Sequence, residues 1–152
     1  MICAPARRSN VGTSAAPLPM KSTTNHTATL LLVEDDVSLR QSLSDFLRDA
    51  GYCPYAVGTM REAWETLRAV KPSVCLLDLN LPDGSGLDLL RRVERERLGV
   101  RVIVMTAFPL QHLRPEDSGH LIAWLTKPVQ PATLLEAIRK AADAEANDAN
   151  HA

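Results

Sequence analysis

Short apolar runs and amphipathic segments alternate regularly along the middle of the chain. Short, largely apolar runs occur at residues 29–33, 74–77 and 100–105, the last interrupted by Arg101 alone, with weaker ones at 54–57 and 121–125. Uninterrupted runs of this length are typical of strands that are buried on both faces of a parallel sheet. The sequence therefore predicts five short, buried strands.

The segments between these runs repeat their apolar residues with helical spacing. The first places apolar side chains on one face of a helix that Gly51 closes. Thr59 to Glu62 has the form of a capping box, and the helix it opens runs to Val70. A third helix is expected around residues 87–93, and the last begins at Pro131, a favoured first helical residue. Strands that alternate with helices predict an α/β fold with a doubly wound parallel sheet.

The connection between the fourth and fifth strands departs from this pattern. Pro109 and Pro115 lie within it. A proline inside a helix removes a backbone donor and clashes with the preceding turn. We therefore expect the fourth helix to be short or irregular.

Both ends of the chain lack this apolar periodicity. Residues 1–28 are rich in Pro, Ser, Thr, Ala and Asn and predict a disordered leader, with Met1 and Met20 as alternative starts. Residues 143–152 contain no large apolar residue and predict a flexible tail. A single domain of residues 29–142 is expected between them.

Composition and charge narrow the class of protein. Apolar residues make up 45% and charged residues 23% of the chain, and the formal net charge is -1. These values are ordinary for globular domains and give no sign of direct nucleic-acid or membrane-surface binding. No apolar stretch approaches the roughly 18 residues of a membrane helix, no secretory signal is apparent, and the three cysteines share no C-x-x-C spacing. We therefore expect a cytoplasmic protein.

Candidate chemical groups follow the predicted strands at their carboxyl ends, where open parallel sheets bind ligands. They are Glu34, Asp35 and Asp36 after the first strand, Asp78 and Asn80 after the third, Thr106 after the fourth and Lys127 after the fifth. Each residue alone could be an ordinary turn or cap residue. Their joint placement at successive strand ends favours one shared site.

The chemistry of this set points to phosphoryl transfer. Carboxylates within about 4 Å of one another repel by about 4 kcal/mol per pair at an effective dielectric constant near 20. A divalent cation removes this repulsion, and carboxylate and carbonyl oxygens suit Mg²⁺. A carboxylate beside such a cation can attack a phosphoryl group and form an aspartyl phosphate. The Thr106 hydroxyl and the Lys127 ammonium would help to neutralise the phosphoryl oxygens.

Four segments together resemble the receiver domain of two-component response regulators. They are Leu-Leu-Val-Glu-Asp-Asp (31–36), Leu-Leu-Asp-Leu-Asn-Leu-Pro-Asp-Gly-Ser-Gly-Leu (76–87), Val-Met-Thr-Ala (104–107) and Leu-Thr-Lys-Pro (125–128). The resemblance covers about residues 29–142. It implies a flavodoxin-like sheet of strand order 2-1-3-4-5.

The resemblance also implies roles for individual residues. It makes Asp78 the phosphoacceptor and makes Thr106 and Lys127 its catalytic partners. The implied Mg²⁺ ligands are Glu34, Asp35, Asp78 and the backbone carbonyl of Asn80. Thr106 and Trp124 are the implied conformational switch. Pro128 is implied to follow a cis peptide bond. Asp36 falls just after the acidic pair, so we expect it to cap a helix and not to bind metal.

The implied function is that of a stand-alone response regulator in phosphorelay signal transduction. Such a phosphoprotein accepts a phosphoryl group from a sensor histidine kinase or phosphotransfer protein and relays the signal to a protein target. It is not an enzyme acting on other substrates, although it catalyses its own phosphorylation and slow dephosphorylation. Trp124 replaces the usual Tyr or Phe, and the prolines fall in the helix by which similar domains dimerise, so we expect a monomer or weak homodimer.

Two alternatives stay open on the sequence. The first is a receiver-like interaction module that works without phosphorylation, although a degenerate domain would be expected to lose some of the site residues. The second is a small Mg²⁺-dependent phosphohydrolase. Such enzymes commonly carry a second catalytic Asp two residues after the nucleophile, where this chain has Asn80.

Overall fold

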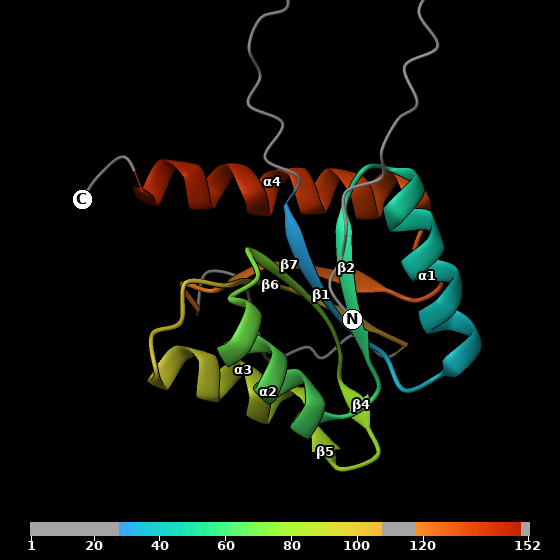
Figure 1. The fold of residues 1–152 in the computed structure, drawn as a ribbon, viewed down its shortest axis with the longest axis horizontal. Helices are drawn as coiled ribbons and strands as arrows, with labels where there is room; N and C mark the ends of the chain where they lie inside the picture. The colour runs from blue at the N-terminus through green and yellow to red at the C-terminus, as the bar shows by residue number, and fades with distance from the viewer. Residues whose placement is uncertain (1–27, 108–117, 150–152) are drawn as a thin grey trace, which may run out of the picture.

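A five-stranded parallel sheet forms the centre of the computed structural model, which describes residues 28–107 and 118–149, the last five as backbone only (Figure 1). Its strands are β1 (Thr29–Val33), β2 (Cys53–Val57), β3 (Val74–Asp78), β6 (Arg101–Thr106) and β7 (Leu121–Thr126). They lie in the order β2-β1-β3-β6-β7, and every neighbouring pair is parallel. Strands β6 and β7 are the fourth and fifth predicted strands, so the predicted α/β fold and the strand order 2-1-3-4-5 are confirmed.

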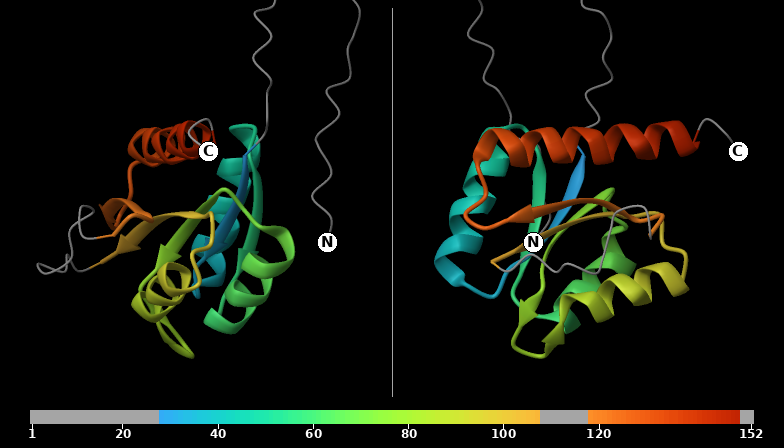
Figure 2. Two further views of the ribbon diagram at one scale, coloured as in Figure 1. Left: turned by 90° about the vertical axis from the view of Figure 1, so that its left-hand side faces the viewer. Right: turned by 180° about the vertical axis from the view of Figure 1, so that it is seen from behind.

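Two pairs of helices cover the two faces of the sheet (Figure 2). Helices α1 (Val37–Asp49) and α4 (Pro131–Ala149) pack on one face, and α2 (Met60–Val70) and α3 (Gly86–Arg95) pack on the other. Successive strand residues point to opposite faces of the sheet. Leu30 and Leu32 of β1 therefore pack in the core under α1 and α4, whereas Leu31 and Val33 pack in the core under α2 and α3. This double burial explains why the strands read as continuous apolar runs.

The helix boundaries follow from local capping. The Asp36 carboxylate accepts a hydrogen bond from the Leu39 N–H at 2.9 Å and so caps α1, as expected. The Thr59 hydroxyl accepts from the Glu62 N–H at 3.1 Å and donates to Glu62 Oε1 at 3.1 Å, which confirms Thr59 as the N-cap of α2. Caps of this kind satisfy backbone donors that the first helical turn leaves free.

Helix α4 is longer than the sequence pattern predicts. It begins at Pro131 as expected and continues to Ala149, past residue 143, where the predicted tail begins; the flexibility of that tail stays a prediction. Alanine, the strongest helix former, recurs through this stretch and extends the helix without a large apolar residue. Neither α4 nor any other helix in the described ranges combines the length and apolar character of a membrane span.

Two predictions fall on parts of the chain that the structure does not describe. The short or irregular fourth helix was expected around Pro109 and Pro115, and residues 108–117 lie outside the described ranges. The disordered leader was expected over residues 1–28, of which Ala28 alone is described. Both stay predictions.

A small hairpin after β3 is the one element in the described ranges that the sequence did not predict. It consists of β4 (Asn80–Leu81) and β5 (Gly84–Ser85), which pair antiparallel. Strands of two residues are too short to show a period of alternation. The Pro82-Asp83-Gly84 turn pattern was the available signal. The hairpin lies directly after Asp78 and beside the first turn of α2 (Figure 1).

Candidate functional site

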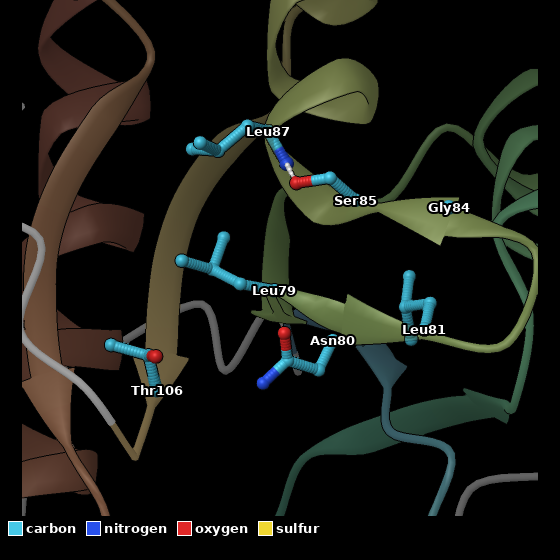
Figure 3. Close-up of a pocket in the computed structure, with 7 residues that line it drawn as sticks. All are labelled: Leu79, Asn80, Leu81, Gly84, Ser85, Leu87 and Thr106. Atoms are coloured by element: carbon cyan, nitrogen blue, oxygen red, sulfur yellow. Dashed lines mark hydrogen bonds between the residues drawn. The ribbon is translucent and has the colours of Figure 1, made fainter.

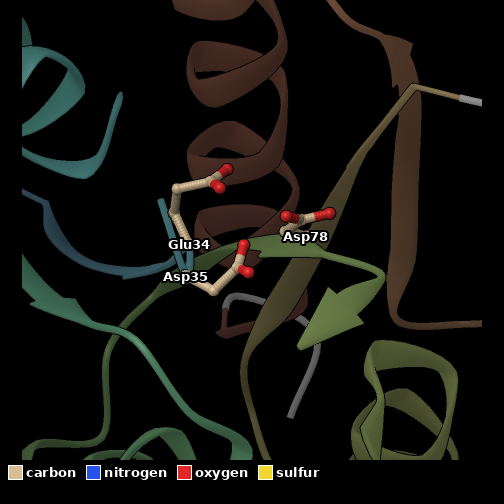
Figure 4. Close-up of side chains that lie close together, drawn as sticks. All are labelled: Glu34, Asp35 and Asp78. Carbon is tan, nitrogen blue, oxygen red and sulfur yellow. The ribbon is translucent and has the colours of Figure 1, made fainter. Parts of the chain in front are cut away.

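Three carboxylates converge at the carboxyl end of the sheet (Figure 4). Glu34 and Asp35 follow β1, and Asp78 is the last residue of the neighbouring strand β3. The pairing of Val33 with Leu77 brings the following residues to the same level of the sheet. One carboxylate oxygen from each acid lies within 4.8 Å of the other two. The sequence prediction that these acids share one site agrees with this geometry.

Glu34 is held by hydrogen bonds on all sides. Its N–H donates to the Val57 carbonyl at 3.0 Å, and its own carbonyl accepts from Arg40 Nη1 at 2.8 Å. Its Oε1 accepts from the Asp36 N–H at 3.2 Å, and its Oε2 accepts from Lys127 Nζ at 2.7 Å. With 1% of its surface exposed, Glu34 is a buried anchor of the site.

Lys127 supplies an internal counter-charge to two of the carboxylates. Its Nζ lies 2.7 Å from Glu34 Oε2 and 3.1 Å from Asp78 Oδ2. Partial burial lowers the pKa of Lys127, but its hydrogen bonds to Glu34 and Asp78 outweigh that effect and leave the pKa above its usual value. Burial raises the pKa of Glu34, and the hydrogen bond from Lys127 opposes this rise. Lys127 is therefore charged at neutral pH.

The donor set fits a divalent cation. Asp35 is exposed and so has a carboxylate open to solvent, whereas Asp78 is only 5% exposed. Asn80 stays close to Asp78, because its N–H donates to Asp78 Oδ1 at 3.2 Å. Three carboxylates and one ammonium leave a formal charge of -2, which one divalent cation would balance. Hard oxygen ligands of this kind are those that Mg²⁺ prefers.

Thr106 lies beside the acidic cluster. It is the last residue of β6 and is 2% exposed, and the pairing of Asp78 with Met105 places it one residue beyond the end of β3. Its carbonyl accepts a hydrogen bond from the Lys127 N–H at 2.8 Å. The peptide bond between Lys127 and Pro128 is cis. The fourth and fifth strand ends thus reach the same site as the first and third.

A pocket of about 540 Å³ adjoins this end of the sheet (Figure 3). Its described lining comprises Thr106, Leu79, Leu87 and four hairpin residues: Asn80, Leu81, Gly84 and Ser85. The hairpin therefore forms one wall of this partly apolar pocket.

Trp124 lies on the same sheet face as Thr106. It pairs with Val104, two residues before Thr106, and side chains two apart on a strand share a face. The ring is half-buried against the cluster that α2 and α3 cover, and its buried Nε1–H has no hydrogen-bond acceptor within the described part of the chain. This position is compatible with a switch role for Trp124, which stays a prediction.

Two supports of the site were missing from the sequence analysis. Arg40 ties α1 back to the Glu34 carbonyl, and Asp83 joins the hairpin to the start of α2. Both contacts involve backbone atoms, which almost every residue possesses, so residue types and their spacing offer no signal for them.

Comparison with known proteins agrees with this geometry. The family model described as the response regulator receiver domain matches residues 30–139. Over 115 residues the chain is 31% identical to the transcriptional regulatory protein PdtaR of Mycobacterium tuberculosis, covering 74% of this chain and 55% of PdtaR. It is 28% identical over 113 residues to the chemotaxis protein CheY of Thermotoga maritima, covering 73% of this chain and 94% of CheY. The match therefore spans about half the length of the first relative and nearly all of the second.

Solved structures show the same fold. A CheY-like response regulator receiver domain protein from Methanospirillum hungatei superposes with a TM-score of 0.71 at 27% identity, covering 80% of this chain and 98% of the other. The chemotaxis response regulator CheY4 of Vibrio cholerae superposes with a TM-score of 0.68 at 27% identity, covering 76% and 98%. Because the family model covers most of the chain, this protein belongs to the family of response regulator receiver domains.

Proposed function

We propose that this receiver accepts a phosphoryl group on Asp78 and relays a signal through the resulting conformational change. The observation that carries the proposal is the convergence of Asp78 with Glu34 and Asp35, with Lys127 Nζ 3.1 Å from Asp78 Oδ2. The Asp78 carboxylate is the nucleophile, and Lys127 is the nearest cation in the described part of the site. A phosphorylated histidine of a sensor kinase or a phosphotransfer protein is the proposed donor.

In the transfer step, an Asp78 carboxylate oxygen attacks phosphorus and forms an O–P bond. The bond from phosphorus to the donor nitrogen breaks, and its electron pair stays on that nitrogen. Lys127 moves from carboxylate to phosphoryl oxygens, and the Thr106 hydroxyl donates to another of them. Since phosphoryl transfer depends on alignment and charge neutralisation, these contacts supply what the chain itself must contribute.

Asp35, Asp78 and the backbone carbonyl of Asn80, with Glu34 behind them, are the residues proposed to hold Mg²⁺. The bound cation supplies neutralisation of the phosphoryl oxygens and of the acidic cluster. Asp35 suits this role because its carboxylate is exposed, whereas both oxygens of Glu34 already accept hydrogen bonds. The same residues would serve the slow loss of the phosphoryl group to water.

The proposed output is a change in protein–protein contact in the cytoplasm. Moving a two-state domain from 1:99 to 99:1 needs about 5.5 kcal/mol of differential stabilisation. New contacts from Thr106 and Lys127 to a phosphoryl dianion are a reasonable source of it, and Trp124 is the proposed partner that repacks. The names of the relatives span chemotaxis and transcriptional regulation, so no target is assigned.

Intact-mass measurement tests the proposal directly. After incubation with Mg²⁺ and a small phosphodonor, the wild-type protein should gain the mass of one phosphoryl group, and chelation of the metal should prevent the gain. Asp78→Asn should remove the gain. Asp88→Asn, an exposed acid of α3, is the matched control and should keep it. No gain in the wild type, or an unchanged gain in Asp78→Asn, would contradict the proposal.

A further inference from the structure

The segment after the phosphoacceptor is a hairpin that needs external support. Its strands pair only through Asn80 with Ser85 and Leu81 with Gly84. An isolated two-stranded hairpin is marginally stable in water at best, even when its strands are longer than these. Because Asn80 is an expected source of a metal ligand, whatever holds the hairpin also affects the site.

Asp83, at the hairpin tip, attaches the hairpin to α2. Its Oδ1 accepts a hydrogen bond from the Met60 N–H at 2.8 Å, and its Oδ2 accepts one from the Arg61 N–H at 3.1 Å. These are among the donors that the first turn of a helix leaves unpaired, and a carboxylate is favoured there by the helix dipole. The hydrogen bond from Met60 is the main cause that holds the pKa of Asp83 below its usual value.

A second contact supports the same junction. A Cβ placed on Gly84 would lie 2.8 Å from the Met60 sulfur, so Met60 lies directly against the hairpin. Helix α2 is itself fixed, because Ala63 and Leu67 are buried in the core. The junction therefore joins the hairpin to a rigid element.

Helix α2 leads back to the acidic cluster by a short path. It begins three residues after Val57, the last residue of β2, whose carbonyl accepts from the Glu34 N–H. The Asp83 hydrogen bonds thus complete a series of contacts that connects Asp78, through the hairpin, α2 and β2, to Glu34. A loss of the Asp83 hydrogen bonds would detach the hairpin, and with it Asn80, from α2.

We propose that Asp83 is a positioning residue of the phosphoacceptor site: by holding the hairpin on α2, it fixes Asn80 and the main chain after Asp78 for metal binding. This inference rests on the proposed function. Asp83 touches neither the metal nor the phosphoryl group and acts through the hairpin.

The opposing view is that Asp83 only stabilises α2. The variant Thr59→Ala distinguishes a positioning role of Asp83 from a purely stabilising one. Thr59 is the local cap of α2 and has no hydrogen bond to the hairpin in the described structure. The variant therefore weakens the same helix end while leaving the hairpin attached. Asp83→Asn is the conservative variant, since its amide oxygen can keep one of the two hydrogen bonds.

The experiment measures Mg²⁺ affinity by calorimetry and stability by urea unfolding in the full chain. Asp83→Ala should weaken Mg²⁺ binding about tenfold, the scale typical of residues that orient metal ligands, and Asp83→Asn should lie between it and wild type. Thr59→Ala should lower the unfolding midpoint without changing the affinity. Equal affinity in Asp83→Ala and wild type, or an equal loss in Thr59→Ala, overturns the inference.

Two further readouts keep the outcome clear. Should Asp83→Ala fail to fold, Asp83→Asn is compared with wild type by hydrogen exchange, where faster exchange of the Asn80 and Gly86 amides is expected and unchanged exchange overturns the inference. If wild-type protein binds Mg²⁺ and gains a phosphoryl group, and the Asp83 variants show the same Mg²⁺ affinity and the same gain, this inference alone is overturned. Wild-type protein that does neither overturns the proposed function as well.

Discussion

Replacement of Lys127 by methionine is expected to destabilise the fold without Mg²⁺ and to tighten Mg²⁺ binding. Methionine keeps much of the length of the side chain but removes the ammonium. Glu34 and Asp78, which are 1% and 5% exposed, would then lose the cation that both carboxylates contact. The site would be left with three mutually repelling carboxylates.

The size of the effect follows from these contacts. At an effective dielectric constant of about 20, distances of 2.7 and 3.1 Å correspond to gross attractions of about 6 and 5 kcal/mol. Desolvation cancels much of this attraction, and removal of one partner of a buried ion pair typically costs about 3–5 kcal/mol. Because the Lys127 side chain is 21% exposed, we expect a loss near the lower end, about 3 kcal/mol.

Mg²⁺ should reverse much of this loss. Without Lys127, Glu34 Oε2 and Asp78 Oδ2 are both free to face the cation, and no ammonium has to be displaced. We expect a gain in Mg²⁺ affinity of about tenfold, which corresponds to about 1.4 kcal/mol. Saturating Mg²⁺ should therefore stabilise Lys127→Met more than it stabilises wild type.

The assay is urea unfolding in chelator and in excess Mg²⁺, combined with calorimetric titration of Mg²⁺. Lys127→Arg keeps the positive charge and is the control, so its response to Mg²⁺ should resemble that of wild type. The reasoning is refuted if Lys127→Met is as stable as wild type in chelator, or if it binds Mg²⁺ no more tightly.

Three further predictions concern the surroundings of the site. A Cβ on Gly86 would lie 2.5 Å from the Asp78 carbonyl oxygen, so Gly86→Ala should cost about 1–3 kcal/mol in urea unfolding and reduce the phosphoryl gain. Gly99→Ala, where a Cβ meets nothing within 4 Å, should show neither loss, and equal effects would contradict the packing argument. Burial raises the pKa of Cys75 to about 12, so alkylation at pH 8 should spare it in native protein, as peptide mass mapping can check. Because the pKa of Asp83 lies below its usual 3.8, its contribution is present above that pH and fades in more acid solution; the stability difference between wild type and Asp83→Asn should vanish there.

The elements of this fold were predictable because their signals are local. Strands buried on both faces must be apolar throughout, and β3, in which every residue is buried, shows this most clearly. Asp36 and Thr59 mark helix starts because their side chains reach backbone donors only three residues ahead. The convergence of the acids was predictable because the carboxyl ends of parallel strands share one edge of the sheet.

The tertiary structure alone decided how the site residues support one another. Lys127 contacts Glu34, which lies 93 residues away in the sequence, and Asp83 contacts Met60, which lies 23 residues away. Arg40 binds a backbone carbonyl, which every residue possesses and which therefore leaves no trace in the residue pattern. Sequence determines which groups arrive at the end of the sheet, because strand and helix signals act over a few residues. Their hydrogen-bond partners depend on distances that exist only once the strands have paired and the helices have packed.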